Sequence, residues 1–239
     1  MITGLKAELR AHANPEKVAF FPRFFKTGPG EYGEGDKFLG ITVPSTRLVA
    51  KKYIDLPLKE LEELLSSPWH EDRLTALHIM VYRFNKSDDA TQKELYEFYI
   101  KHTDRINNWD LVDTSARDVV GGYIYHHQEL LPKLNQLSQS KILWERRIAV
   151  IASSYFIGKG EPDITIRLSE ALLHDTEDLI HKAVGWMLRE VGKRCGQDVL
   201  LKFLDQHAHE MPRTMLRYSI EHLSEPTRQK YLRADLPVL

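Results

Sequence analysis

One carboxylate and three other side chains are the residues of this sequence best placed to do chemistry. Asp113 stands where the equivalent segments of the chain carry small or apolar residues, and a buried carboxylate is costly unless it is hydrogen-bonded or functional. Trp109 lies four residues earlier, so the two side chains share a helix face one turn apart. Arg147 and Trp186 belong to the next two helical segments. The four residues can therefore converge on one surface.

A structural role is the alternative for each of these residues. Both tryptophans could pack in the core, and Asp113 could cap a neighbouring helix or pair with Arg147 without taking part in a reaction. Metal chemistry is not indicated, because the 11 histidines show no HExxH-type spacing and the single cysteine excludes a multi-cysteine site and an internal disulfide. We therefore expect neither a metal nor a cofactor.

The elements that must position these side chains are helices in a repeat. Apolar residues follow a helical period along the chain, and alternating strand patterns are almost absent. Aligned helical segments place basic residues at Arg73, Arg147, Lys182 and Arg217, with Asp110 at the equivalent position between the first two. The period of about 35–37 residues is typical of HEAT-like helix pairs. The sequence predicts an all-α fold: one α-solenoid domain over residues 1–239, made of HEAT-like helical hairpin repeats and curved with a concave face.

Helix starts and stops divide the chain further. Asn14, Pro15 and Glu16 predict a helix N-terminus, and that helix should run to about Lys26. Residues 27–37 are glycine-rich, lack a phosphate-binding GxxxxGK[ST] pattern, and are expected to form a mobile surface loop. The remaining helices are expected at 45–55, 57–66, 68–85, 89–105, 108–126, 128–138, 141–158, 163–174, 177–194, 197–208, 212–223 and 225–233.

Positions next to the repeated basic residue are expected to lie mostly in the core. One position after it the repeats carry Leu74, Leu111, Ile148, Ala183 and Tyr218. Six positions after it they carry Ile79, Ala116, Ser153, Leu188 and Leu223.

The charge balance is close to neutral, with 33 Lys and Arg against 34 Asp and Glu. Taken alone, this argues mildly against nucleic acid as a partner. A solenoid, however, can sort its charges by face, and basic residues in one column would offer phosphate contacts to a polyanion; solvated surface charge is the alternative. The apolar stretches are too short to span a bilayer and the N-terminus lacks a signal-peptide hydrophobic region, so a cytoplasmic protein is expected.

The sequence resembles the AlkD-like family of HEAT-repeat DNA alkylation repair glycosylases. The likeness is carried by NNWDLVD at 107–113, LWERR at 143–147 and KAVGWMLRE at 182–190, with further matches at 14–17 and 38–41. It spans nearly the whole chain. The resemblance implies a monofunctional glycosylase that acts on cationic N3- and N7-alkylated purines in double-stranded DNA; the alternatives are a non-catalytic HEAT-repeat binder of damaged or branched DNA and a protein scaffold.

The resemblance also implies roles for individual residues. Trp109 and Trp186 would flank the deoxyribose of the lesion, and Asp113 would be the catalytic carboxylate. Arg147 would hold the DNA backbone beside it, with the adjacent Arg146 as the alternative. Phosphate contacts are expected from Arg73, Arg146, Lys182, Arg189 and Arg217. The protein is expected to act as a monomer, associated with the nucleoid when it is on DNA. An inserted loop at 27–37, and Phe24 where some relatives have Tyr, depart from the family pattern.

Overall fold

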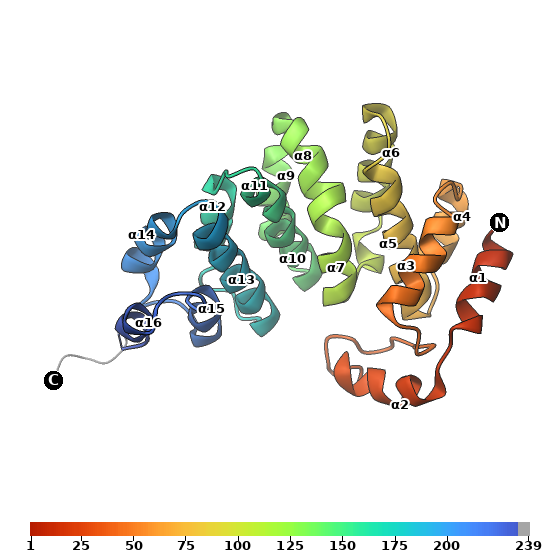
Figure 1. The fold of residues 1–239 in the computed structure, drawn as a ribbon, viewed down its shortest axis with the longest axis horizontal. Coiled ribbons are helices and arrows are strands. Elements are labelled where there is room, and N and C mark those ends of the chain that lie inside the picture. Colours follow the sequence, from red (N-terminus) through yellow and green to blue (C-terminus); the bar gives the residue numbers. More distant parts are fainter. Residues whose placement is uncertain (234–239) are drawn as a thin grey trace. The chain divides into compact units, whose positions relative to one another are not determined.

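The structure, a computed structural model, describes residues 1–233, and the regular elements in this range are helices joined by loops (Figure 1). Within these residues the only strand-like pairing is an isolated backbone bridge between Lys37 and Trp69. The chain divides into two compact units, Met1–Val119 and Val120–Leu239. The predicted all-α fold is confirmed.

The first unit is built around one buried helix, α5 (His70–Phe84). The other helices of this unit are α1 (Ile2–Ala11), α2 (Pro15–Phe24), α3 (Val43–Lys52), α4 (Leu58–Leu65), α6 (Asp89–Lys101) and α7 (Trp109–Ala116). Helix α5 packs against α3, α4, α6 and α7, and every residue from His70 to Met80 is buried. Because α5 is buried and packs against α7, residues at the start of α5 can position α7.

The second unit is organised in the same way around α13 (Asp178–Arg194), which packs against α10, α14 and α15. Its other helices are α8 (Tyr123–His126), α9 (Leu131–Ser138), α10 (Leu143–Ala152), α11 (Ser154–Gly158), α12 (Asp163–Ala171), α14 (Gln197–His207), α15 (Arg213–Ser219) and α16 (Glu225–Leu232). Alternate helices thus stack on one another within each unit, as helix-pair repeats require. None of the helices in the described range is both long and apolar enough to cross a membrane.

Local signals in the sequence account for some of the helix starts. Asn14 caps α2, because its side chain accepts a hydrogen bond from the backbone N–H of Glu16 at 2.9 Å and Pro15 takes the first helical position.

The helix predicted over 108–126 is not continuous, because a π-helical segment, Arg117–Gly122, interrupts it. At Gly121 an added Cβ would lie 2.1 Å from the carbonyl oxygen of Ala152, so only glycine allows this close approach.

The predicted core positions hold with few exceptions. The residues after the repeated basic position are buried at Leu74, Leu111, Ile148 and Ala183, whereas Tyr218 is 37% exposed. Six positions after the basic residue, all but Leu223 are buried. The helical period therefore predicted the interior correctly along most of the chain.

Candidate functional site

The residues that could do chemistry in the first unit surround a cavity of about 780 Å³. It lies among α2, the segment 41–44, α5 and α7. Its walls are largely apolar, with a few polar groups. They are formed by Phe20, Phe21, Phe24, Phe25, Ile41, Thr42, Val43, Pro44, Leu74, Trp109 and Thr114, with the polar groups Glu16, Lys17, Arg47, His70, Glu71, Asp110 and Asp113. An apolar cavity with a few convergent polar groups is the usual form of a binding site.

Trp109 opens α7 and lines this cavity. The ring of Phe25 stacks on its indole with centroids 5.4 Å apart, and Phe24 meets it edge-on at 5.7 Å. Phe25 is buried, whereas Phe24 is half exposed. These contacts fix the orientation of the indole beside the cavity, so it presents a rigid aromatic wall to a bound group.

Asp113 lies on α7 one turn after Trp109 and lines the same cavity. The helix spacing predicted from the sequence thus places a carboxylate and an indole together. Burial raises the pKa of Tyr99 well above its usual value, and the nearby charge of Asp113 raises it further. Tyr99 therefore stays neutral beside Asp113.

A buried polar network lies under the cavity and joins the glycine-rich loop to α5 and α7. Nδ1 of His70 lies 3.0 Å from Oδ2 of Asp36, and its Nε2 lies 2.8 Å from Oδ2 of Asp110. Arg73 donates to the other carboxylate oxygen of Asp36. The loop predicted to be a surface feature thus ends in a carboxylate that is only 5% exposed.

The two carboxylates keep His70 protonated. Burial lowers the pKa of His70, but the negative charges and hydrogen bonds of Asp110 and Asp36 outweigh it and raise that pKa to about 9. Burial likewise opposes the charge of Asp36, yet His70 and Arg73 hold the pKa of Asp36 below its usual value. As an imidazolium, His70 donates through both ring nitrogens, one to each carboxylate.

Glu71 is a second buried carboxylate next to His70, and its role is structural. Its oxygens accept hydrogen bonds from the backbone N–H groups of Leu39, Gly40 and Ile41 at 2.8–3.1 Å. This contact fixes the segment that leads into α3, where an added Cβ at Gly40 would lie 2.1 Å from the carbonyl oxygen of Asn14.

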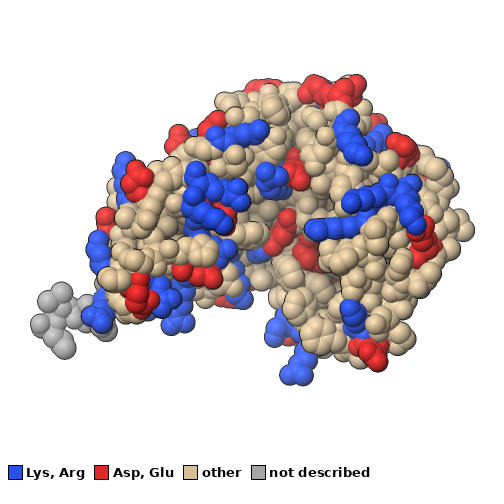
Figure 2. All heavy atoms as spheres, in the orientation of Figure 1, with Lys and Arg blue, Asp and Glu red and all other residues tan. Residues whose placement is uncertain are grey.

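Two basic side chains at the cavity are placed to contact an anionic ligand. Lys17 and Arg47 both line it, and in the part of the chain that the structure describes neither forms an ion pair. On the face shown in Figure 2, basic and acidic side chains are interspersed over the surface of each unit. Although the chain as a whole is nearly neutral, Lys17 and Arg47 can therefore contact an anion at the cavity.

The expected site residues of the second unit lie on α10 and α13. Arg147 is buried and donates through Nη1 to the carbonyl oxygen of Leu179 at 2.6 Å. Arg146 pairs with Asp175, with Nε and Oδ2 2.6 Å apart. Trp186 is partly exposed on α13. Trp109 and Asp113 thus belong to the first unit, and these residues belong to the second.

The expected phosphate-binding residues differ in exposure. Arg73 is 6% exposed and bonded to Asp36, so its side chain does not lie on an exposed stripe as the repeat spacing predicted. Arg189 is largely buried and pairs with Glu221. Lys182 is 40% exposed and pairs with Asp178 one turn earlier, while Arg217 is exposed.

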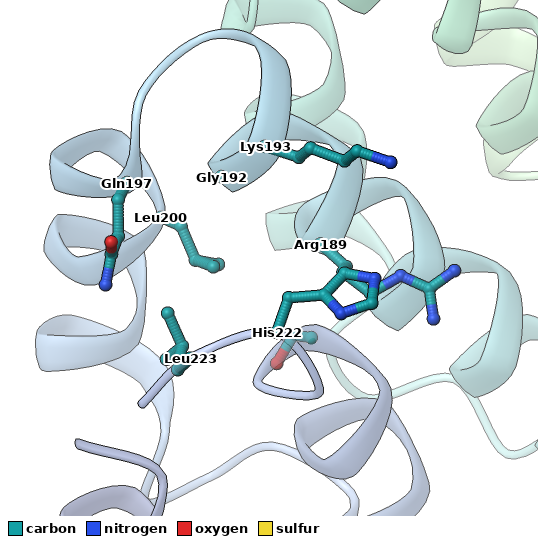
Figure 3. Close-up of a pocket in the computed structure, with 8 residues that line it drawn as sticks. Arg189, Gly192, Lys193, Gln197, Leu200, His222 and Leu223 are labelled. Atoms are coloured by element: carbon teal, nitrogen blue, oxygen red, sulfur yellow. The ribbon is translucent and has the colours of Figure 1, made fainter. Parts of the chain in front are cut away.

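A second cavity, of about 370 Å³, lies in the second unit (Figure 3). Leu200 and Leu223 give it an apolar part, and Arg189 and Lys193 extend from α13 toward the same side. Its lining residues include neither a carboxylate nor a tryptophan, tyrosine or phenylalanine. Within residues 1–233 no group of three or more His, Cys, Asp or Glu side chains is placed to hold a metal ion. The cavity of the first unit is therefore the better candidate for chemistry.

The network of Asp36, His70 and Asp110 was not predicted from the sequence. These residues are 34 and 40 positions apart in the chain, and no local spacing connects them. The only signal was Asp110 itself, a carboxylate at a position where the other repeats carry a basic residue. The basic partner of Asp110 is His70, the first residue of α5.

The fold and the cavity define a helical-repeat protein with a carboxylate beside an aromatic wall. The sequence profile of a family described as DNA alkylation repair enzyme matches residues 5–223, and the chain belongs to that family. This membership supports a role in the repair of alkylated DNA. No protein with curated annotation matches the chain significantly.

Solved structures share the fold. A protein described as a predicted DNA alkylation repair enzyme from Enterococcus faecalis is 18% identical with a TM-score of 0.69, over 90% of this chain and 98% of that one. AlkD2 from Streptococcus mutans is 16% identical with a TM-score of 0.58, over 87% of this chain and 98% of that one. At these identities the likeness concerns the fold.

Proposed function

We propose that the protein is a monofunctional DNA glycosylase that hydrolyses the N-glycosidic bond of cationic N3- or N7-alkylated purines in duplex DNA. Membership of the DNA alkylation repair enzyme family supports the substrate class. The observation that carries the proposal is the presence of Asp113 and Trp109 one helical turn apart on the wall of one cavity. We propose that a single chain acts alone, without a metal or cofactor.

The chemistry of such lesions needs few catalytic groups. An N3- or N7-alkylated purine already carries a positive charge, so it leaves as a neutral base without being protonated by a general acid. As the glycosidic bond breaks, positive charge develops on the deoxyribose. A carboxylate beside the sugar stabilises that charge and can orient or deprotonate the attacking water. Asp113 is proposed to act in this way.

The aromatic walls fit the same chemistry. The face of a tryptophan attracts a nearby cation by about 0.5–2 kcal/mol, most strongly where water is excluded. Trp109, held by Phe24 and Phe25, offers such a face beside Asp113. A cationic base or sugar is favoured there over a neutral one, so unmodified purines are poor substrates.

The cations at the cavity suit the DNA backbone. Lys17 and Arg47 carry no ion-pair partner among the described residues and line the same cavity as Asp113. Phosphate contacts from such residues fix the position of the DNA without reading its sequence. Lys182, Arg189, Arg217 and Arg146 of the second unit remain proposed phosphate contacts, and Trp186 and Arg147 remain proposed DNA contacts of that unit. Arg73 is not proposed as one, because its side chain is buried and bonded to Asp36.

The experiment is a base-release assay on duplex DNA treated with a methylating agent. The wild-type protein should release 3-methyladenine or 7-methylguanine, and Asp113→Asn should lose at least about 100-fold in rate while still binding DNA. Asp104→Asn, an exposed carboxylate outside the cavity, is the matched control and should keep full activity. Tight DNA binding without any released base would instead favour a non-catalytic binder of damaged DNA.

A further inference from the structure

We propose that Asp36, His70 and Asp110 form a positioning network that fixes the first turn of α7, so that the glycine-rich loop is part of the machinery that places Trp109 and Asp113. The effect on reaction rate rests on the proposed function. The effect on the position of α7 does not, and it can be measured separately.

Asp36 is the centre of this network. Its Oδ2 accepts from Nδ1 of His70 at 3.0 Å and from Nδ2 of Asn108 at 3.2 Å, and its Oδ1 accepts from Arg73. The carboxylate thus uses both oxygens on partners from α5 and from the residue that precedes α7. Because His70, Asn108 and Arg73 all donate to Asp36 and are themselves buried, they hold the end of the glycine-rich loop in one place.

Hydrogen bonds of this network hold the residue before Trp109 and the residue after it. Asn108, which is fully buried, accepts from the backbone N–H of Trp109 at 2.8 Å while it donates to Asp36. Asp110, the residue after Trp109, is held by His70 at 2.8 Å. With both neighbours fixed, the backbone of Trp109 has little freedom, and Asp113 follows one turn later on the same helix.

The same residues also hold the aromatic rings. The ring of His70 lies 4.9 Å from those of Phe25 and Phe38, and Phe25 in turn stacks on the indole of Trp109. A change at His70 therefore reaches Trp109 by two routes, through Asp110 in the backbone and through Phe25 in the side-chain packing.

The charges of the network favour a positioning role over a purely stabilising one. Two carboxylates are balanced by His70 and Arg73, and none of the four side chains is more than 11% exposed. Replacing a buried ion-pair network with apolar packing is often neutral for stability, whereas the network can favour one arrangement of a segment over others. This arrangement lies directly against the cavity that contains Asp113, since both His70 and Asp110 line it.

The chain offers a matched control elsewhere in the first unit. Asp72 is also a fully buried carboxylate on α5, held by two bonds from Arg10 at 2.9 Å and by Ser67 at 2.7 Å. It does not line the cavity. Asp36→Asn and Asp72→Asn each remove one buried charge, so a merely structural role predicts the same consequences for both.

The first test is hydrogen–deuterium exchange of the folded full-length protein, compared at α7. We expect Asp36→Asn and His70→Gln to speed exchange of the amides of residues 107–113 at least tenfold, and Asp72→Asn to leave them within twofold of wild type. Asp36→Glu keeps the charge and should restore most of the protection, because the preceding Gly35 gives the loop room to adjust. Equal effects of Asp36→Asn and Asp72→Asn at α7, or no effect of either, would overturn the proposal.

The second test is the kinetics of base release. Asp36→Asn should lower kcat about tenfold with KM within twofold, because DNA binding is retained while Asp113 is misplaced; Asp72→Asn should retain wild-type kcat. If the wild-type protein releases no base, the proposed function fails, and the exchange experiment alone decides whether the network positions α7. An unchanged kcat in Asp36→Asn, with wild-type activity present, would contradict the catalytic part of the inference.

Discussion

His70 makes the stability of the first unit depend on pH in the alkaline range. Its pKa is raised from 6.5 to about 9 by the two carboxylates. A group whose pKa is higher in the folded state stabilises the protein below its unfolded pKa, and this stabilisation is lost as pH rises through the folded pKa. The first unit should therefore lose stability between pH 7 and pH 9.5 as His70 gives up its proton.

The magnitude follows from the shift. One pKa unit corresponds to about 1.4 kcal/mol, so a shift from 6.5 to about 9 contributes about 3 kcal/mol at low pH. Roughly 2 kcal/mol of this should disappear between about pH 7 and about pH 9.5. That is a large part of the 5–15 kcal/mol by which typical domains are stable, so it is measurable.

Urea unfolding followed by tryptophan fluorescence measures this effect. A background of Trp144→Phe and Trp186→Phe leaves Trp69 and Trp109 as the only tryptophans, so the signal reports the first unit. The free energy of unfolding of this protein minus that of the same protein with His70→Gln should fall by about 2 kcal/mol between pH 7 and pH 9.5. A difference that stays constant over this range would refute the assignment of His70 as a buried imidazolium between carboxylates.

Acid pH and substitutions at His78, Gly185 and Lys182 are expected to change stability or DNA binding. His78 is buried and its pKa is lowered to about 4 by burial and by the charge of Arg47, so stability present above pH 6.5 should be lost as pH falls toward 4. His78→Phe should remove this loss in acid unfolding measurements. Gly185→Ala should lower the free energy of unfolding by about 2–3 kcal/mol in urea titrations, because its Cβ would lie 2.4 Å from the carbonyl oxygen of Met215. If Lys182 contacts DNA, Lys182→Ala should weaken binding less than about tenfold and reduce the salt dependence by about one phosphate contact, with thermal stability unchanged.

Sequence patterns predicted the helices and the shared face of Trp109 and Asp113 because these depend on local periodicity. An apolar residue every three to four positions both forms a helix and marks its buried side. The cap at Asn14 is equally local, since its partners are two and three residues away. Such features do not require knowledge of which distant segments meet.

The polar network could not be predicted in this way. Arg73 occupies the repeated basic position, and its spacing is the same whether the side chain faces solvent or Asp36. The π-helical segment at 117–122 was missed for a similar reason, because the close approach at Gly121 depends on Ala152, 31 residues later. These features are decided by tertiary packing, which overrides the helical pattern.

Release of free base from methylated duplex DNA is the measurement that tests the proposed function most directly. The proposal predicts that the wild-type protein liberates 3-methyladenine or 7-methylguanine, that Asp104→Asn does so equally well, and that Asp113→Asn binds the same DNA but liberates almost none. Equal base release by Asp113→Asn and the wild-type protein would contradict the assignment of Asp113 as the catalytic carboxylate.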